Sequence, residues 1–259
     1  MNRSPWLDRP KPGLAAREVA LLLMLAACAW AATIVLSRLM AGMTGTMGLG
    51  LGSFVAIWTL MMTAMMLPSV APTASLYAKT VVGNWSARTF GLIAGYLCVW
   101  ALAGLPAFVL ARLAGWLAAG HPAGVRVAAV AAFACCGIYQ LSSLKYRCLA
   151  HCRSPIALLM HYGSYRGRLR DLRAGAHHGG YCLGCCWSLM VVLVALGVMN
   201  VAAMAGLAAV VLVEKLWSRG QAFGRLAGVA ALGLAVATIW LPGLAPGLYA
   251  ASHMSSMAR

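Results

Sequence analysis

Acidic residues are scarce in this sequence, which holds only Asp8, Glu18, Asp171 and Glu214 against 20 lysines and arginines in 259 residues. So few carboxylates, with no Ser-His-Asp arrangement and no phosphate-binding loop, argue against an enzyme. Charged residues of both signs make up 9% of the chain, whereas a soluble domain has roughly a quarter. Because 63% of the residues are hydrophobic, the composition predicts an integral membrane protein in contact with the lipid bilayer.

The net charge of +16 follows from the same scarcity of acids. In a soluble protein, such an excess would indicate a nucleic-acid partner. Here the basic residues lie mostly between apolar runs, where cytoplasmic loops and anionic lipid headgroups account for them. We therefore expect no nucleic-acid partner.

Six apolar segments are long enough to cross a bilayer, which takes about 20 residues each. They are Glu18–Leu39, Gly52–Ala78, Thr89–Ala114, Pro122–Leu144, Cys185–Val213 and Phe223–Leu241. The sequence therefore predicts an all-α fold, a polytopic membrane helix bundle over residues 18–243. A basic N-terminal tail (1–17) precedes the bundle, and a short C-terminal tail (244–259) follows it.

Two short strings recur in the second half of the chain. Trp58–Met61 (WTLM) resembles Trp187–Met190 (WSLM), and Phe90–Gly95 resembles Phe223–Gly228. The two matches suggest a weak three-plus-three repeat of helices, an arrangement known from membrane transporters.

Basic residues are distributed unevenly among the connections. The N-terminal tail, the connection between the second and third segments, the loop 145–181 and the C-terminus hold 14 of the 20. Since cytoplasmic loops carry such an excess, we expect both termini and this loop to face the cytoplasm of a bacterial inner membrane. Lys215, Arg219 and Arg225 violate the rule. They leave open the alternative that residues 182–217 form a pair of helices broken near Asn200.

Two clusters of soft ligands flank the basic loop. Each reads i, i+3, i+4, which places three side chains on one face of a helix. The candidate metal ligands are Cys148, His151 and Cys152 before the loop, and Cys182, Cys185 and Cys186 after it. In the reducing cytoplasm, clustered thiols indicate metal or redox chemistry more often than structural disulfides. Thiolates and imidazole suit a soft transition metal.

The expected helix boundaries bring these clusters together. We expect the fourth helix to continue to Ser154, because Pro155 disfavours further helix. We expect the fifth helix to begin near Cys185, after the turn residues Gly179, Gly180 and Gly184. The cytoplasmic ends of consecutive helices lie close together, so the clusters can face each other. The adjoining Lys145, Arg147 and Arg153, and the helix N-terminus, would favour thiolates.

Further candidate ligands lie nearby or deeper in the bundle. They are the loop histidines His161, His177 and His178, and the second-segment methionines Met61, Met62, Met65 and Met66, which precede the helix-kinking Pro68. Thioethers bind Cu(I) and contribute little to Zn(II), so a methionine-lined route would favour copper. Glu214 is a candidate intramembrane polar site, because an ionisable group at membrane depth is often functional.

Several strings of the chain are typical of one bacterial family. They are Ala64–Pro68, Tyr139-Gln140, Leu144-Lys145, Cys148-Leu149, Cys152–Pro155, Gly179–Trp187, Gly197–Asn200 and Glu214-Lys215. Together they resemble a domain-of-unknown-function family of predicted metal-binding integral membrane proteins, some members of which are labelled copper chaperones. The resemblance runs from about Trp58 to Arg225 and implies metal binding.

We therefore predict a metal-handling protein of the bacterial inner membrane. It would bind a soft transition metal, with Cu(I) favoured and zinc the alternative, for transport or for exchange with a metal-accepting or metal-donating protein. The competing hypothesis is a membrane thiol-disulfide electron carrier that uses Cys182 and Cys185. A C-x-x-C motif at a helix N-terminus forms a reactive thiolate, which is the basis of that hypothesis.

Overall fold

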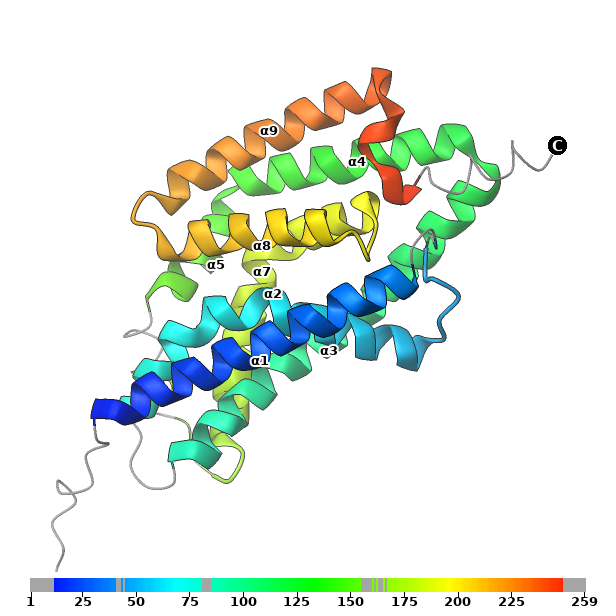
Figure 1. The fold of residues 1–259 in the computed structure, drawn as a ribbon. Helices are drawn as coiled ribbons and strands as arrows, with labels where there is room; N and C mark the ends of the chain where they lie inside the picture. Colours follow the sequence, from blue (N-terminus) through cyan, green and yellow to red (C-terminus); the bar gives the residue numbers. More distant parts are fainter. Residues whose placement is uncertain are drawn as a thin grey trace, which may run out of the picture.

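The protein is described by a computed structural model over residues 12–40, 43, 45–80, 85–154, 160, 162, 165 and 167–248. Within these ranges the fold consists of helices and has no strand, which confirms the predicted all-α bundle (Figure 1). The elements are α1 (Pro12–Leu39), α2 (Leu51–Thr80), α3 (Trp85–Gly120), α4 (Pro122–Leu141), α5 (Ser143–Arg153), α7 (Arg170–Leu196), α8 (Val201–Leu216), α9 (Gly220–Trp240) and a 3-10 turn, η2 (Pro242–Leu244). Both terminal tails and His161 lie largely or wholly outside the described residues.

Six described helices are long and apolar enough to cross a membrane, in agreement with the predicted number. They are α1, α2, α3, α4, α7 and α9. The 16-residue α8 is apolar as well, but it is only about 24 Å long, shorter than the roughly 30 Å of a bilayer's hydrocarbon core. In Figure 1, α4 and α9 lie side by side along one edge, and α1 lies along α2 on the other.

The predicted fourth helix is interrupted, which corrects its expected course to Ser154. Ser142 has an extended backbone (φ −74°, ψ 148°), and its side chain caps the new helix α5 by accepting a hydrogen bond from the Lys145 amide. The cap satisfies a donor that the break would otherwise leave free. The cysteines of the first cluster therefore lie on a short separate helix, whose direction is independent of α4.

The helix that carries the second cluster begins at Arg170, about four turns earlier than expected. Gly179, interpreted as a turn residue, serves close packing instead, as does Gly175 one turn earlier. A side chain at Gly175 would lie 1.8 Å from the Leu92 carbonyl oxygen of α3, and one at Gly179 would lie 3.1 Å from the Tyr96 carbonyl. Such close crossings need residues without a Cβ. Cys182 therefore lies in the interior of α7. The electron-carrier hypothesis rested on a position near a helix N-terminus, and that prediction is wrong.

The apolar run 182–217 is broken, as the alternative interpretation held. Gly197 adopts a φ of +103°, which favours glycine. Asn200 then caps α8 by accepting a hydrogen bond from the Ala203 amide at 3.0 Å. The predicted single fifth helix is therefore two helices, α7 and α8. The chain reverses between them, so that α8 runs back along the bundle (Figure 1).

This extra reversal decides at which end of the bundle the last described residues lie. Pro246 and Gly247 line a cavity together with Ser37 and Arg38, at the far end of α1 from its beginning. The start of α1 and the last described residues thus lie at opposite ends of the bundle. The termini themselves, which were predicted to share the cytoplasmic face, lie outside the described residues. The suggested three-plus-three repeat gains no support. Its matched strings lie in the consecutive helices α2 and α3, and in α7 and α9, which α8 separates.

Candidate metal site

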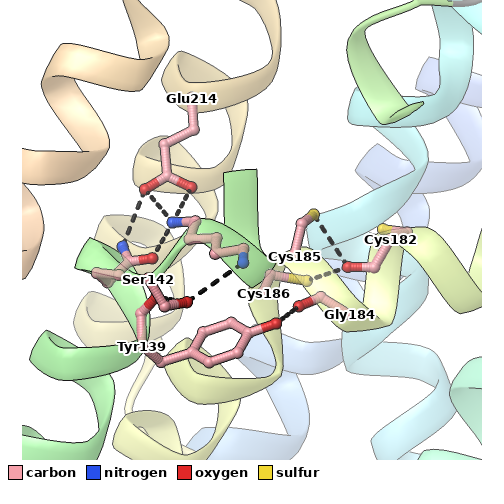
Figure 2. Close-up of polar contacts among 9 residues, drawn as sticks. Tyr139, Ser142, Cys182, Gly184, Cys185, Cys186 and Glu214 are labelled. Carbon is pink, nitrogen blue, oxygen red and sulfur yellow. Dashed lines mark hydrogen bonds and ion pairs between the residues drawn. The ribbon is translucent and has the colours of Figure 1, made fainter. Parts of the chain in front are cut away.

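The two cysteine clusters meet where α5 packs against α7. Gly184 makes this approach feasible, because a Cβ at that position would lie only 3.0 Å from the Cys148 sulfur. The Tyr139 hydroxyl donates a hydrogen bond to the Gly184 carbonyl, which ties the end of α4 to the same turn of α7 (Figure 2). The Cys152 and Cys185 thiols interact electrostatically across this contact. One thiol from each cluster is therefore within reach of a shared ion.

The three cysteines of α7 are almost completely buried, with at most 1% of their surface exposed. The Cys185 and Cys186 thiols donate hydrogen bonds to the Cys182 carbonyl at 3.1 and 2.9 Å, as Figure 2 shows. In contrast, Cys148 and Cys152 of α5 are partly exposed. The cluster of these five thiols, called the thiol cluster below, thus extends from the α5 surface into the protein interior.

A buried lysine provides the charge next to the thiols. The Lys215 ammonium of α8 donates a hydrogen bond to the Cys182 sulfur at 2.9 Å and another to the Ser69 hydroxyl of α2 at 3.1 Å. The Tyr96 hydroxyl of α3 lies 3.0 Å from the same sulfur. A cation and a hydroxyl at hydrogen-bonding distance stabilise a thiolate. Lys215 and Tyr96 therefore both stabilise the charged form of Cys182, whereas its burial opposes that form.

The predicted source of thiolate stabilisation was wrong. Lys145 is turned to Glu214, and the Arg153 guanidinium donates hydrogen bonds to the Trp217 and Ser218 carbonyls. Burial raises the pKa of the Cys148 thiol above its ordinary value, with a smaller contribution from nearby Cys185. Sequence inspection missed Lys215 as the relevant cation. Its only signal was that a lysine follows an apolar run in a place where the positive-inside rule does not expect one.

The candidate histidines occupy three different environments. His151 is exposed, stacks on Tyr181 with ring centroids 4.2 Å apart, and has its Nδ1 2.9 Å from the Arg147 carbonyl. His177 packs edge-on against the same Tyr181. Both rings thus lie against tyrosines on the outside of the thiol cluster. His177 and His178 belong to α7, not to a loop as predicted.

His178 differs from the other two because it faces inward. Its side chain is 4% exposed, its ring lies 5.8 Å from that of Tyr96, and it interacts electrostatically with Lys215 and Cys185. The buried Nδ1 atom has no hydrogen-bond partner among the described residues. A buried nitrogen without a partner is unusual, so His178 is the best placed histidine to join the thiols as a ligand.

The candidate methionines form a buried stripe on α2. Met61, Met62, Met65 and Met66 are all 0% exposed within the main apolar core. Ser69, which contacts Lys215, lies one turn beyond Met65 and Met66 on the same helix. The stripe therefore leads from the level of the thiol cluster toward the beginning of α2.

Glu214 forms a buried polar centre with two residues of α4 and α5. Its carboxylate accepts hydrogen bonds from the Lys145 ammonium, at 2.7 Å to each oxygen, and from the Gln140 amide at 2.9 Å. The Lys145 ammonium also donates to the Gln140 side-chain oxygen (Figure 2). Lys145 and Glu214 are 0% and 2% exposed. This ion pair holds α5 to α8 directly beside the thiol cluster.

The thiol cluster is not arranged as a closed metal cage. Over the described parts of the chain, no three His, Cys, Asp or Glu side chains converge with the geometry of a metal-binding group. The reason is visible in Figure 2, where the Cys185 and Cys186 thiols point to the Cys182 carbonyl.

Comparison with known proteins gives one match. No curated protein and no solved structure matches the chain. The sequence model of the PpoB2 family, described as "Copper chaperone", matches residues 55–238. That range extends from α2 into α9 and includes every residue of the thiol cluster, Lys215 and the Glu214 ion pair. The chain therefore belongs to the PpoB2 copper chaperone family.

Proposed function

We propose that this protein is a membrane-embedded copper chaperone that binds Cu(I) in the thiol cluster and passes it to a partner protein. The contact between Cys152 of α5 and Cys185 of α7 carries the proposal, because it joins two ligands from separate helices. Thiolates are soft ligands that select Cu(I). The family description supports copper as the cargo.

The charge of the site supports a monovalent ion. Two thiolates around Cu(I) carry one net negative charge, which the Lys215 ammonium beside Cys182 would neutralise. Zn(II) takes four ligands in its structural sites. Four thiolates around Zn(II) would leave two negative charges, so a single buried lysine would leave one of them without compensation. Buried charge without compensation is costly, and the charge of an all-thiolate site therefore supports Cu(I) over Zn(II).

The gradient of exposure supports delivery. Cys148 and Cys152 are partly exposed on α5, whereas Cys182, Cys185 and Cys186 are buried in α7. An ion bound between Cys152 and Cys185 can accept a ligand from a partner on the exposed side while the buried thiol still holds it. Exchange of one thiolate at a time avoids release of the free ion. A metal-accepting or metal-donating protein with soft ligands of its own fits this arrangement.

The basic residues support a cytoplasmic position for the thiol cluster. Arg168, Arg170 and Arg173 precede or begin α7, and Lys79 and Arg88 lie at the ends of α2 and α3 on the same end of the bundle. Cytoplasmic ends of inner-membrane helices carry such residues. On this basis we place the site at the cytoplasmic side of a bacterial inner membrane.

The electron-carrier hypothesis has one remaining support, the Lys215 ammonium next to Cys182, which favours a reactive thiolate. Metal content and thiol count separate the two functions. Protein purified under strictly reducing conditions and loaded with Cu(I) should retain about one copper per chain after gel filtration, and should show nine free cysteines when denatured. Protein without copper that instead cycles a Cys182–Cys185 disulfide would contradict the chaperone proposal. Zinc retained in preference to copper would contradict the choice of metal.

A further inference from the structure

Methionines gather around a second cavity, at the other end of the bundle from the thiol cluster. The cavity measures ≈ 360 Å³ and lies between the end of α1, the α1–α2 connection, the late turns of α3 and the α7–α8 turn. Four of its lining residues are methionines, Met40, Met43, Met47 and Met199. This end of the bundle is at the right of Figure 1, where α1 ends and α4 begins.

The backbone of the α1–α2 connection directs Met47 inward. Met47 has a φ of +57°, a conformation that side-chain-bearing residues rarely adopt. Its side chain is nevertheless 6% exposed, so the unusual backbone places a thioether in the interior. Gly45 allows this turn, because its backbone lies so close to α3 that a Cβ would be 3.0 Å from the Ala111 carbonyl. An outlier of this kind is often found at a binding site.

The other three thioethers come from two different connections. Met40 and Met43 belong to one turn, in which the Met43 amide donates a hydrogen bond to the Met40 carbonyl at 3.2 Å. Met199 comes from the α7–α8 turn, directly before the capping residue Asn200. Asn200 itself is engaged, since its side chain bonds the Ala203 amide and the Leu196 carbonyl. The soft donors of this cavity are therefore the methionines.

We propose that Met40, Met43, Met47 and Met199 form a second metal site, which takes a monovalent soft ion, Cu(I), through thioether ligands. Thioethers are neutral, so they bind Cu(I) and discriminate against Zn(II). Arg38 also lines the cavity and repels a cation. With neutral ligands and a nearby positive charge, this site binds more weakly than the thiol cluster and exchanges its ion readily.

The choice of Cu(I) as the ion of this second site rests on the proposed function, but its four methionine ligands are separate from the thiol cluster. The methionine stripe of α2 lies between the two sites, since α2 begins beside the α1–α2 connection and reaches the level of Lys215 at Ser69. A thioether site at one end and a thiol cluster at the other give the protein a weak and a tight copper site on opposite faces. The weak site would exchange copper on the face opposite the cytoplasm.

The test uses full-length protein in detergent in which all nine cysteines are changed to serine. Its methionine methyl groups carry ¹³C, and Cu(I) is added anaerobically with ascorbate. We expect about one Cu(I) to bind per chain and to shift the methyl signals of Met40, Met43, Met47 and Met199. The signal of Met24, which is 59% exposed on α1, should not shift. The Met40/Met43/Met47/Met199→Leu variant in this background should lose at least tenfold in affinity, and Arg38→Gln should gain affinity.

Two results would overturn the second site. One is a thiol-free protein that binds no Cu(I); the other is binding that shifts Met24, or the α2 methionines alone. The same titration of the wild-type protein keeps the two proposals apart. If the second site fails, tight binding by the wild-type thiols is unaffected. If the thiol cluster fails, the methyl shifts of the thiol-free protein remain.

Discussion

The Lys215 ammonium lies 2.9 Å from the Cys182 sulfur, in the interior of a protein with very few acidic residues. A buried lysine normally pairs with a carboxylate. Here it contacts a thiol, a serine hydroxyl and no described carboxylate in hydrogen-bond range. This arrangement makes Lys215 the counter-charge of a thiolate site, and it leads to the first prediction.

Replacement of Lys215 by leucine should weaken Cu(I) binding while the fold is kept. The variant loses a charge-assisted hydrogen bond, which contributes about 1.5–3 kcal/mol, or roughly 10- to 100-fold in affinity. Competition with a Cu(I) chelator measures the change. Lys215→Arg should retain most of the affinity, because the charge is preserved. Lys79→Leu, at an exposed lysine of α2, is the matched control and should leave affinity unchanged. Equal affinities in all three variants would show that Lys215 has no part in metal binding.

The Glu214–Lys145 ion pair should matter for stability more than for metal affinity. Glu214→Gln leaves the Lys145 ammonium buried without its partner, which costs about 3–5 kcal/mol. Thermal unfolding in detergent, followed by circular dichroism, should show a clearly lower Tm. The double variant Glu214→Leu/Lys145→Met should recover much of the loss, because it removes both charges. A double variant that is less stable than Glu214→Gln would show that the pair is a net stabiliser in its own right.

Substitution of the α2 methionine stripe tests whether these side chains form a copper route or only fill the core. Because methionine and leucine have similar volumes, Met61/Met62/Met65/Met66→Leu should cost less than about 1.5 kcal/mol in stability. It nevertheless removes every thioether of the stripe, so we expect loss of copper tolerance or copper delivery in cells. Met24→Leu, on the exposed face of α1, is the control. Normal copper handling in the fourfold variant would assign these methionines to the core.

Topology provides a test of the α7–α8 break. Since α8 reverses the chain once more, reporters fused at the N-terminus and after Arg168 should lie on the same side of the membrane. A reporter at the C-terminus should lie on the other side. Paired reporters, one active only in the cytoplasm and one only in the periplasm, measure this directly. Cytoplasmic readings from all three reporters would contradict this topology.

The sequence predicted the fold class and the number of long apolar helices, because these depend on hydrophobic length. It misplaced the start of α7, since a glycine such as Gly179 can mark either a turn or a close helix crossing, and only the position of α3 decides between them. It indicated the break at Asn200 through the misplaced basic residues. It did not indicate that Lys215 contacts Cys182, because residues 33 positions apart are joined here by tertiary packing alone.

The most direct test of the copper site is a Cu(I) competition titration of wild type, Cys152→Ser and Cys185→Ser, one substitution on each helix. Cys28→Ser and Cys98→Ser, at exposed cysteines outside the cluster, serve as controls. If one ion is shared between α5 and α7, both cluster variants should lose most of the tight binding and both controls should keep it. Tight binding of about one Cu(I) that survives in either Cys152→Ser or Cys185→Ser would contradict a shared site.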